Sequence, residues 1–240
     1  MIKPNTLRTK LDNGEPTVGT HILFADPDIP EIIGDTGLFD YGEYAAEYTV
    51  LDHTLLYHLA RAGDCGNLPL MIKPDQESQG FWTQAALGAG FKAVLFTDIR
   101  TPEDVEASHG CMRPDTPDTN GKMGVKLRRP ALSSYDTETY LEDLRSIIFA
   151  IMIEKNVTVE NIDAVLDRAR EKGVDMTQWG PADFGFSRGE PGLMGTPEIR
   201  PFEELVIKKS LEYGIRPRIE IEIGRRRVGK ECRSRWGPNH

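Results

Sequence analysis

The chain has 240 residues, of which 39% are hydrophobic, and this is enough for one sizeable core. Its formal net charge of −9 argues against a general nucleic-acid-binding surface, which needs a basic patch. No run approaches the ~18 apolar residues of a membrane span, and the N-terminal residues lack the apolar core of a secretion signal, so we expect a cytoplasmic protein. The three cysteines, Cys65, Cys111 and Cys232, are widely spaced, which indicates reduced thiols rather than disulfides or a zinc site.

Apolar, β-branched runs alternate along the chain with segments that have apolar residues at helical spacing. Helix signals accompany this alternation: Thr101 is a candidate cap, followed by acids in the first turn, where the helix dipole favours anions. The alternation is typical of a parallel α/β sheet, and a length of ~200–250 residues suits a TIM-type (β/α)8 barrel. The predicted strands are residues 17–24, 39–48, 68–74, 92–99, 148–154, 174–180 and 215–223.

Two stretches do not fit this alternation. The loop around Arg113 to Arg129 is predicted either to present cations to a second substrate carboxylate or to be solvated. Residues 224–240 carry six basic residues and cannot supply an eighth strand with its helix. The predicted organisation is a barrel domain, 1–223, that is either complete or incomplete at its C-terminal end, and a basic tail, 224–240. The tail is a disordered segment, a basic binding arm, or the product of truncation or a shifted reading frame.

Two acids lie where two successive predicted strands end. Glu154 closes the run 148–154, and Asp183 comes three residues after the run 174–180. Ligands of parallel α/β folds bind at the C-terminal ends of the strands. Two carboxylates there would suit a hard divalent cation such as Mg²⁺, which takes oxygen ligands and keeps several waters. The alternative is a strand-end salt bridge together with a helix cap.

Three stretches, residues 13–41, 152–163 and 174–192, resemble the HpcH/HpaI aldolase family, most specifically through MIE at 152–154 paired with GPADF at 180–184. These are class II, metal-dependent aldolases of 2-oxo acids with a (β/α)8 barrel, generally hexameric. The resemblance implies that Glu154 and Asp183 bind Mg²⁺, Mn²⁺ or Co²⁺, which stabilises a pyruvate enolate as a Lewis acid. It also implies that Gly180, Pro181 and Ala182 approach the substrate carboxylate, since a helix start suits an anion.

The chain departs from the family pattern at two strand ends. Typical members carry Asp-x-Glu-His after the second strand, with the His as base, whereas this chain has Ala45, Ala46, Glu47 and Tyr48. Tyrosine, with an ordinary pKa near ~10, is a poor base at pH 7 but can donate a hydrogen bond. Lys73 stands where the family has an Arg that steadies the enolate, so it keeps the charge without the planar fork.

The sequence therefore predicts a metal-dependent carbon–carbon lyase, an aldolase, acting on a 2-oxo acid such as a 4-hydroxy-2-oxo acid. Lys73, Tyr48 and Glu47 are the predicted catalytic residues, and the alternatives for Lys73 are a surface or salt-bridge lysine and a Schiff-base lysine. Two other functions stay open: related enolate chemistry with another electrophile, as in a Claisen-type condensation or a hydrolysis, and a non-catalytic truncated barrel. The expected partners are a small-molecule 2-oxo acid and further copies of the chain, without nucleic acid or membrane.

Overall fold

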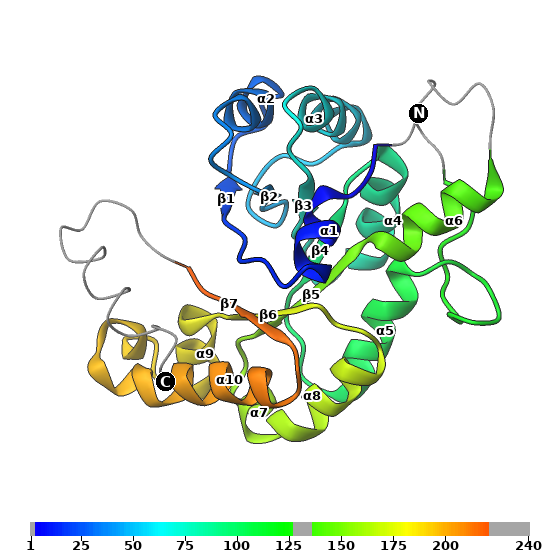
Figure 1. Cartoon of the computed structure of the whole chain (residues 1–240). Coiled ribbons are helices and arrows are strands. Elements are labelled where there is room, and N and C mark those ends of the chain that lie inside the picture. Colours follow the sequence, from blue (N-terminus) through cyan, green and yellow to red (C-terminus); the bar gives the residue numbers. More distant parts are fainter. Residues whose placement is uncertain (1–2, 127–135, 221–240) are drawn as a thin grey trace.

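The computed structural model describes residues 3–126 and 136–220, and within them seven parallel strands form one sheet (Figure 1). The strands lie side by side in chain order, and each strand pairs in parallel with the next. This is the strand–helix order that the sequence predicts, in a curled, incomplete barrel. The strands are β1 (Gly19–Ile22), β2 (Tyr41–Tyr44), β3 (Leu70–Ile72), β4 (Ala93–Phe96), β5 (Ile148–Ile153), β6 (Met176–Trp179) and β7 (Arg216–Arg218).

Helices connect the strands and cover the outside of the curled sheet (Figure 1). The helix after β4 begins as the sequence predicts, because the Thr101 side chain accepts from the Asp104 N–H and Asp104 reaches back to the Thr101 N–H. The described helices are α1 (Thr6–Asp12), α2 (Asp28–Asp35), α3 (His53–Cys65), α4 (Gln79–Ala89), α5 (Pro102–Met112), α6 (Thr137–Ser146), α7 (Asn156–Glu160), α8 (Ile162–Glu171), α9 (Pro181–Arg188) and α10 (Arg200–Glu212), with 3₁₀ turns at Leu193–Gly195 and Pro197–Ile199.

The strands alternate their side chains between two cores, as the two-residue period of a strand requires. On β5, Phe149, Ile151 and Ile153 belong to the larger core, which also contains the apolar faces of the helices. Ile148, Ala150 and Met152 belong to a smaller core inside the curled sheet. Leu7 and Leu11 of α1 join this inner core, so the first helix closes the end of the barrel at which the strands begin.

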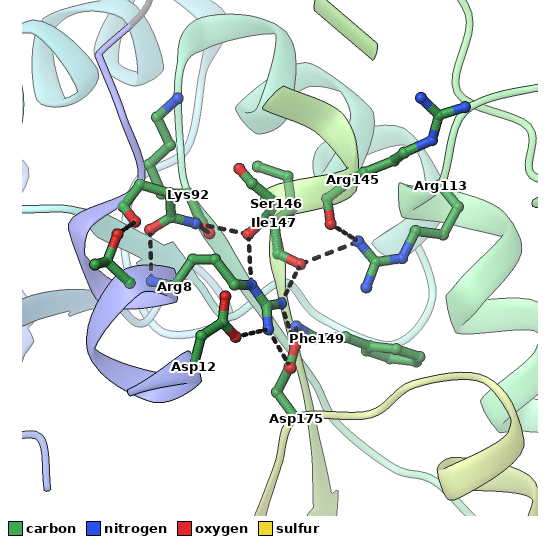
Figure 2. A network of polar contacts seen from close by, with 11 residues as sticks. Arg8, Asp12, Lys92, Arg113, Arg145, Ser146, Ile147, Phe149 and Asp175 are labelled. Atoms are coloured by element: carbon green, nitrogen blue, oxygen red, sulfur yellow. Dashed lines mark hydrogen bonds and ion pairs between the residues drawn. The ribbon is translucent and has the colours of Figure 1, made fainter. Parts of the chain in front are cut away.

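A polar network fixes that closed end, which we call the barrel floor (Figure 2). The guanidinium of Arg8 on α1 donates to both carboxylate oxygens of Asp175, at 2.6 and 2.7 Å. Asp175 also accepts the N–H of Phe149 on β5, at 2.8 Å. Arg113 donates to the carbonyls of Leu144, Arg145 and Ile147, which lead into β5. The floor is thus held by arginines that lie across the starts of two strands.

The structure corrects several sequence predictions. The predicted strand 39–48 is limited to Tyr41–Tyr44, because the chain turns directly afterwards with a hydrogen bond from the Tyr48 N–H to the Ala45 carbonyl. Of the loop 113–129, which the sequence leaves between presenting cations and being solvated, the first residue, Arg113, does neither, because its side chain is buried in the barrel floor. Arg128, Arg129 and the tail 224–240 lie outside the described residues.

Candidate active site at the C-terminal ends of the strands

The two acids predicted from the sequence lie at neighbouring strand ends. Ile153 pairs in register with Trp179, so the next residues, Glu154 and Gly180, lie side by side. Glu154 is only 3% exposed. Asp183 lies in the first turn of α9, which begins at Pro181 directly after β6, and its side chain is half exposed. The sheet register and the helix start therefore bring the two carboxylates together at the open end of the barrel.

The carboxyl group of Glu154 is short of favourable partners. Burial raises its pKa from the ordinary 4.5 to about 7, although a hydrogen bond from the Asp98 N–H at 2.8 Å and the positive charge of Lys155 act against this rise. The negative charge of Asp183 contributes to the rise in this pKa, and the positive charge of the Lys73 ammonium opposes it. Glu154, Asp183 and Lys73 thus lie within electrostatic reach of one another, in an environment that favours additional positive charge.

Glycine is required beside Glu154. A Cβ at Gly180 would lie 2.6 Å from the Glu154 Cβ and 2.8 Å from its Oε2, closer than real Cβ atoms approach. Gly180 also precedes the first turn of α9, where backbone N–H groups lack helical acceptors and favour an anion. The local sequence Gly180-Pro181-Ala182 therefore keeps space around the carboxylate and starts a helix at the same point.

Lys155 connects the two strand ends. Its ammonium lies 2.6 Å from Oδ1 of Asp98, after β4, and 2.9 Å from Oδ1 of Asp183, after β6. Asp98 has a left-handed backbone, with φ 57°, which aims its N–H at Glu154. Sequence reasoning missed both residues. An acid that follows a buried strand at 98, and a lysine directly after Glu154, were the available signals.

Lys73 and Glu47 form an ion pair at the ends of β3 and β2, with side chains mostly buried. Burial would lower the pKa of Lys73, but the hydrogen bond and the charge of Glu47, with those of Tyr48 and Glu43, raise it. The Lys73 ammonium also lies 5.1 Å from the ring centroid of Tyr48. Desolvation and a hydrogen bond to Glu47 raise the pKa of Tyr48 to about 12. These shifts favour the charged form of Lys73 and the protonated form of Tyr48, which is 67% exposed.

A second polar group inside the barrel was not predicted. Arg218 on β7 pairs with Glu43 on β2, and both side chains are almost fully buried. His21 on β1 lies 3.5 Å from Glu43 and 3.6 Å from Glu220. His21 therefore faces this ion pair. The group joins the first two strands to the last strand by side chains, and we call it the polar seam.

The donor set suits a divalent cation bound by few protein ligands. In residues 3–126 and 136–220, no group of three or more His, Cys, Asp or Glu side chains is arranged to hold a metal ion by itself. Glu154 and Asp183 offer carboxylate oxygens on neighbouring strand ends, and the raised pKa of Glu154 shows that added positive charge is favourable there. Mg²⁺ is usually held by one or two carboxylates with waters and substrate oxygens, so these residues fit such an ion.

The chain is similar to known aldolases in sequence and to known barrels in fold. It is 26% identical over 207 residues to the 2-keto-3-deoxy-L-rhamnonate aldolase of Salmonella typhimurium, covering 85% of this chain and 74% of that protein. It superposes on the HpcH/HpaI aldolase of Desulfitobacterium hafniense DCB-2 with a TM-score of 0.79 at 20% identity, covering 94% and 85% of the two chains. Citrate synthase SbnG gives a TM-score of 0.76 at 19% identity, covering 96% and 87%.

No family model matches the chain. Within the described ranges, none of the helices has the length and apolar character needed to span a membrane. The structural similarities establish the fold, and the sequence similarity extends over the strand ends that carry the candidate site.

Proposed function

We propose that this chain, a relative of the HpcH/HpaI aldolases, is a carbon–carbon lyase that acts on a 2-oxo acid such as a 4-hydroxy-2-oxo acid. The observation that carries the proposal is the buried Glu154 carboxylate, flanked by Asp183, Lys73 and the start of α9 at the open end of the barrel. Active sites of this type of barrel lie at the C-terminal ends of the strands.

In this proposal Glu154 and Asp183 hold a divalent cation, Mg²⁺, Mn²⁺ or Co²⁺. When bound, such an ion acts as a Lewis acid on the 2-oxo acid and favours the enolate. Glu154 is poised for this role, because its desolvated carboxylate gains more from a nearby cation than a solvated one would. Asp183 supplies the exposed side of the pair, from which an ion can enter.

The backbone at the start of α9 binds the substrate carboxylate in this proposal. Gly180 permits a close approach because it has no side chain, and Pro181 fixes the first helical turn. The N–H groups of that turn, beginning at Ala182, point towards the helix N-terminus and favour a negative charge. The substrate is thereby oriented with its carboxylate at α9 and its reacting carbons towards β2 and β3.

Lys73 and Tyr48 act on the reacting oxygen in this proposal. The Lys73 ammonium stays charged through its pairing with Glu47, and stabilises negative charge that develops on the substrate. Tyr48, with a pKa of about 12, stays protonated and donates a hydrogen bond. Glu47 holds the two in place as their common partner. The assembly of copies of the chain remains a prediction of the family resemblance.

The test is pyruvate release from a 4-hydroxy-2-oxo acid, followed by a coupled dehydrogenase. We expect activity that EDTA abolishes, that Mg²⁺ or Mn²⁺ restores, and that Asp183→Ala lowers by roughly a hundredfold or more. Activity that survives both EDTA and Asp183→Ala would exclude this mechanism. Exchange of the C3 protons of pyruvate for deuterium, without cleavage, would point instead to enolate chemistry with another electrophile.

A further inference from the structure

Lys155 is a cation in the middle of the proposed metal site. It directly follows Glu154 and its side chain is only 9% exposed. A lysine at a strand end normally extends its ammonium into water. Here the ammonium lies 2.6 Å from Asp98 and 2.9 Å from Asp183 instead. One residue of the chain therefore places a fixed positive charge between acids from two different strand ends.

The cluster as a whole carries unbalanced negative charge. Asp98, Glu154 and Asp183 bring three carboxylates, and Lys155 brings one ammonium, so two negative charges are left when all four groups are ionised. Arg100 lies 3.7 Å from Asp98, at the outer side, with a side chain that is half exposed. With Arg100 counted, one negative charge remains, and Oδ1 of Asp183, one of the two oxygens that this residue offers to a cation, is already paired with Lys155.

Lys155 is held as a charged partner by Asp98 and Asp183. Burial would lower its pKa, but the hydrogen bonds to Asp98 and Asp183 and the charge of Glu154 outweigh this and raise it. Lys155 also precedes α7, so its backbone is fixed by the helix start. Movement of the ammonium away from Asp183 therefore requires a change of side-chain rotamer while the strand end stays in place.

We propose that Lys155 is a built-in competitor that holds Asp98 and Asp183 together in the cation-free protein and gives up Asp183 when a divalent cation binds, so that Lys155 weakens cation affinity. This inference rests on the proposed function, because it concerns the same acids. A unit positive charge a few ångströms from a divalent ion repels it strongly in a partly buried site. The chain thus favours cations that bind tightly enough to displace the ammonium.

The experiment is calorimetric titration of the full chain with MnCl₂, for the unchanged protein, Lys155→Met, Lys155→Arg and Lys172→Met. Lys172 is the matched control, because it is also paired with an acid, Glu106 at 2.8 Å, but lies outside the site. We expect Lys155→Met to bind Mn²⁺ at least tenfold more tightly than the unchanged protein. Lys155→Arg keeps the charge and should stay within about threefold of the unchanged protein, as should Lys172→Met.

The possible results separate this inference from the proposed function. Equal or weaker Mn²⁺ binding by Lys155→Met, with a preserved circular dichroism spectrum, would overturn the competitor role and make Lys155 a residue that positions Asp183. Tighter binding that Glu154→Gln then removes from the Lys155→Met protein would support it. No Mn²⁺ binding by either the unchanged protein or Lys155→Met would overturn both the competitor role and the proposed metal site.

Discussion

The two ends of the barrel use charged residues in opposite ways. At the floor, Arg8 and Asp175 form a bidentate pair, and Asp175 also accepts the Phe149 N–H, so the carboxylate is fully provided with donors (Figure 2). At the open end of the barrel, which we call the mouth, Glu154 has one backbone donor and a pKa raised by burial. Lys155 is shared there between Asp98 and Asp183. Charged groups that have all their hydrogen-bond partners stabilise a fold, whereas charged groups with shifted pKa values are typical of functional sites.

The same contrast extends to neutral groups. Directly after β4, Oγ1 of Thr97 is buried without a hydrogen-bond partner among the described residues, and so is Oε1 of Gln178 on β6. Arg113 at the floor, by comparison, makes three hydrogen bonds to carbonyls. Buried polar groups that lack partners cost stability, and a ligand or water that pairs with them recovers it. A ligand that reaches Thr97 or Gln178 could therefore gain a hydrogen bond there.

The largest effect is expected from Glu154→Gln at the mouth. This change keeps the shape but removes the charge, so pyruvate release should fall by roughly a thousandfold. The cation-free protein should at the same time become more stable at pH 8. The folded-state pKa of about 7 lies above the ordinary 4.5, so the contribution of Glu154 to stability is present below pH 4.5 and is lost as pH rises through 7.

The measurement for this prediction is thermal melting in EDTA at pH 4.5 and pH 8. The two proteins should agree at pH 4.5, and at pH 8 Glu154→Gln should be more stable by up to about 3 kcal/mol. A lower melting temperature of Glu154→Gln at pH 8 would show that Glu154 is a stabilising residue like those of the floor, and would remove the contrast between the two ends.

The next effect is expected from Asp175→Ala at the floor. It removes the charged acceptor of two Arg8 hydrogen bonds and the acceptor of the Phe149 N–H, while Arg8 keeps its bonds to the Ser146 and Ile147 carbonyls, so the free energy of unfolding should fall by about 3 kcal/mol. The melting temperature should then fall by roughly 6–12 °C. Asp12→Ala is the control, because Asp12 also contacts Arg8, at 3.5 Å, but is exposed and should cost under about 0.5 kcal/mol. Equal losses for both variants would contradict a floor held by the Arg8–Asp175 pair.

The smallest effect is expected from Lys73→Met, which should lower pyruvate release by about ten- to a hundredfold. Lys73→Arg should recover part of the activity, since it restores the charge and adds a planar fork. Because Lys73→Met leaves the mostly buried Glu47 carboxylate without its partner, the melting temperature should also fall, and activity is therefore measured well below the unfolding transition. Full activity of Lys73→Met would place the lysine outside the reaction and restrict the functional part of the mouth to Glu154 and Asp183.

The sequence predicts well those features that depend on local pattern. Strand-helix alternation gives the seven strands in the right order, and the rule that strand ends meet at one edge brings Glu154 and Asp183 together. The strand that ends at Tyr44 is shorter than predicted, because a turn follows it directly, whereas the predicted strand 215–223 extends beyond the described residues. Local pattern is thus sufficient for the fold and for one half of the site.

Contacts between distant residues account for what the sequence does not predict. Lys155 is adjacent to Glu154 in sequence, yet its role comes from Asp98 and Asp183, which belong to other strands. The burial of Arg113 and its three carbonyl acceptors likewise depend on the C-terminal end of α6 lying against the residue that follows α5. The polar seam between Arg218 and Glu43 joins residues from opposite ends of the sheet. Neither the periodicity nor the spacing of residues in the sequence reveals pairs that are so far apart along the chain.

The polar seam has a consequence for the order of assembly. Each strand from β1 to β7 pairs with the strand that precedes it in the chain, so the sheet can grow as the polypeptide leaves the ribosome. The ion pair of Arg218 with Glu43 can form only after the last of these strands has been synthesised. The burial of this charge in the ion pair therefore has to follow the synthesis of β7.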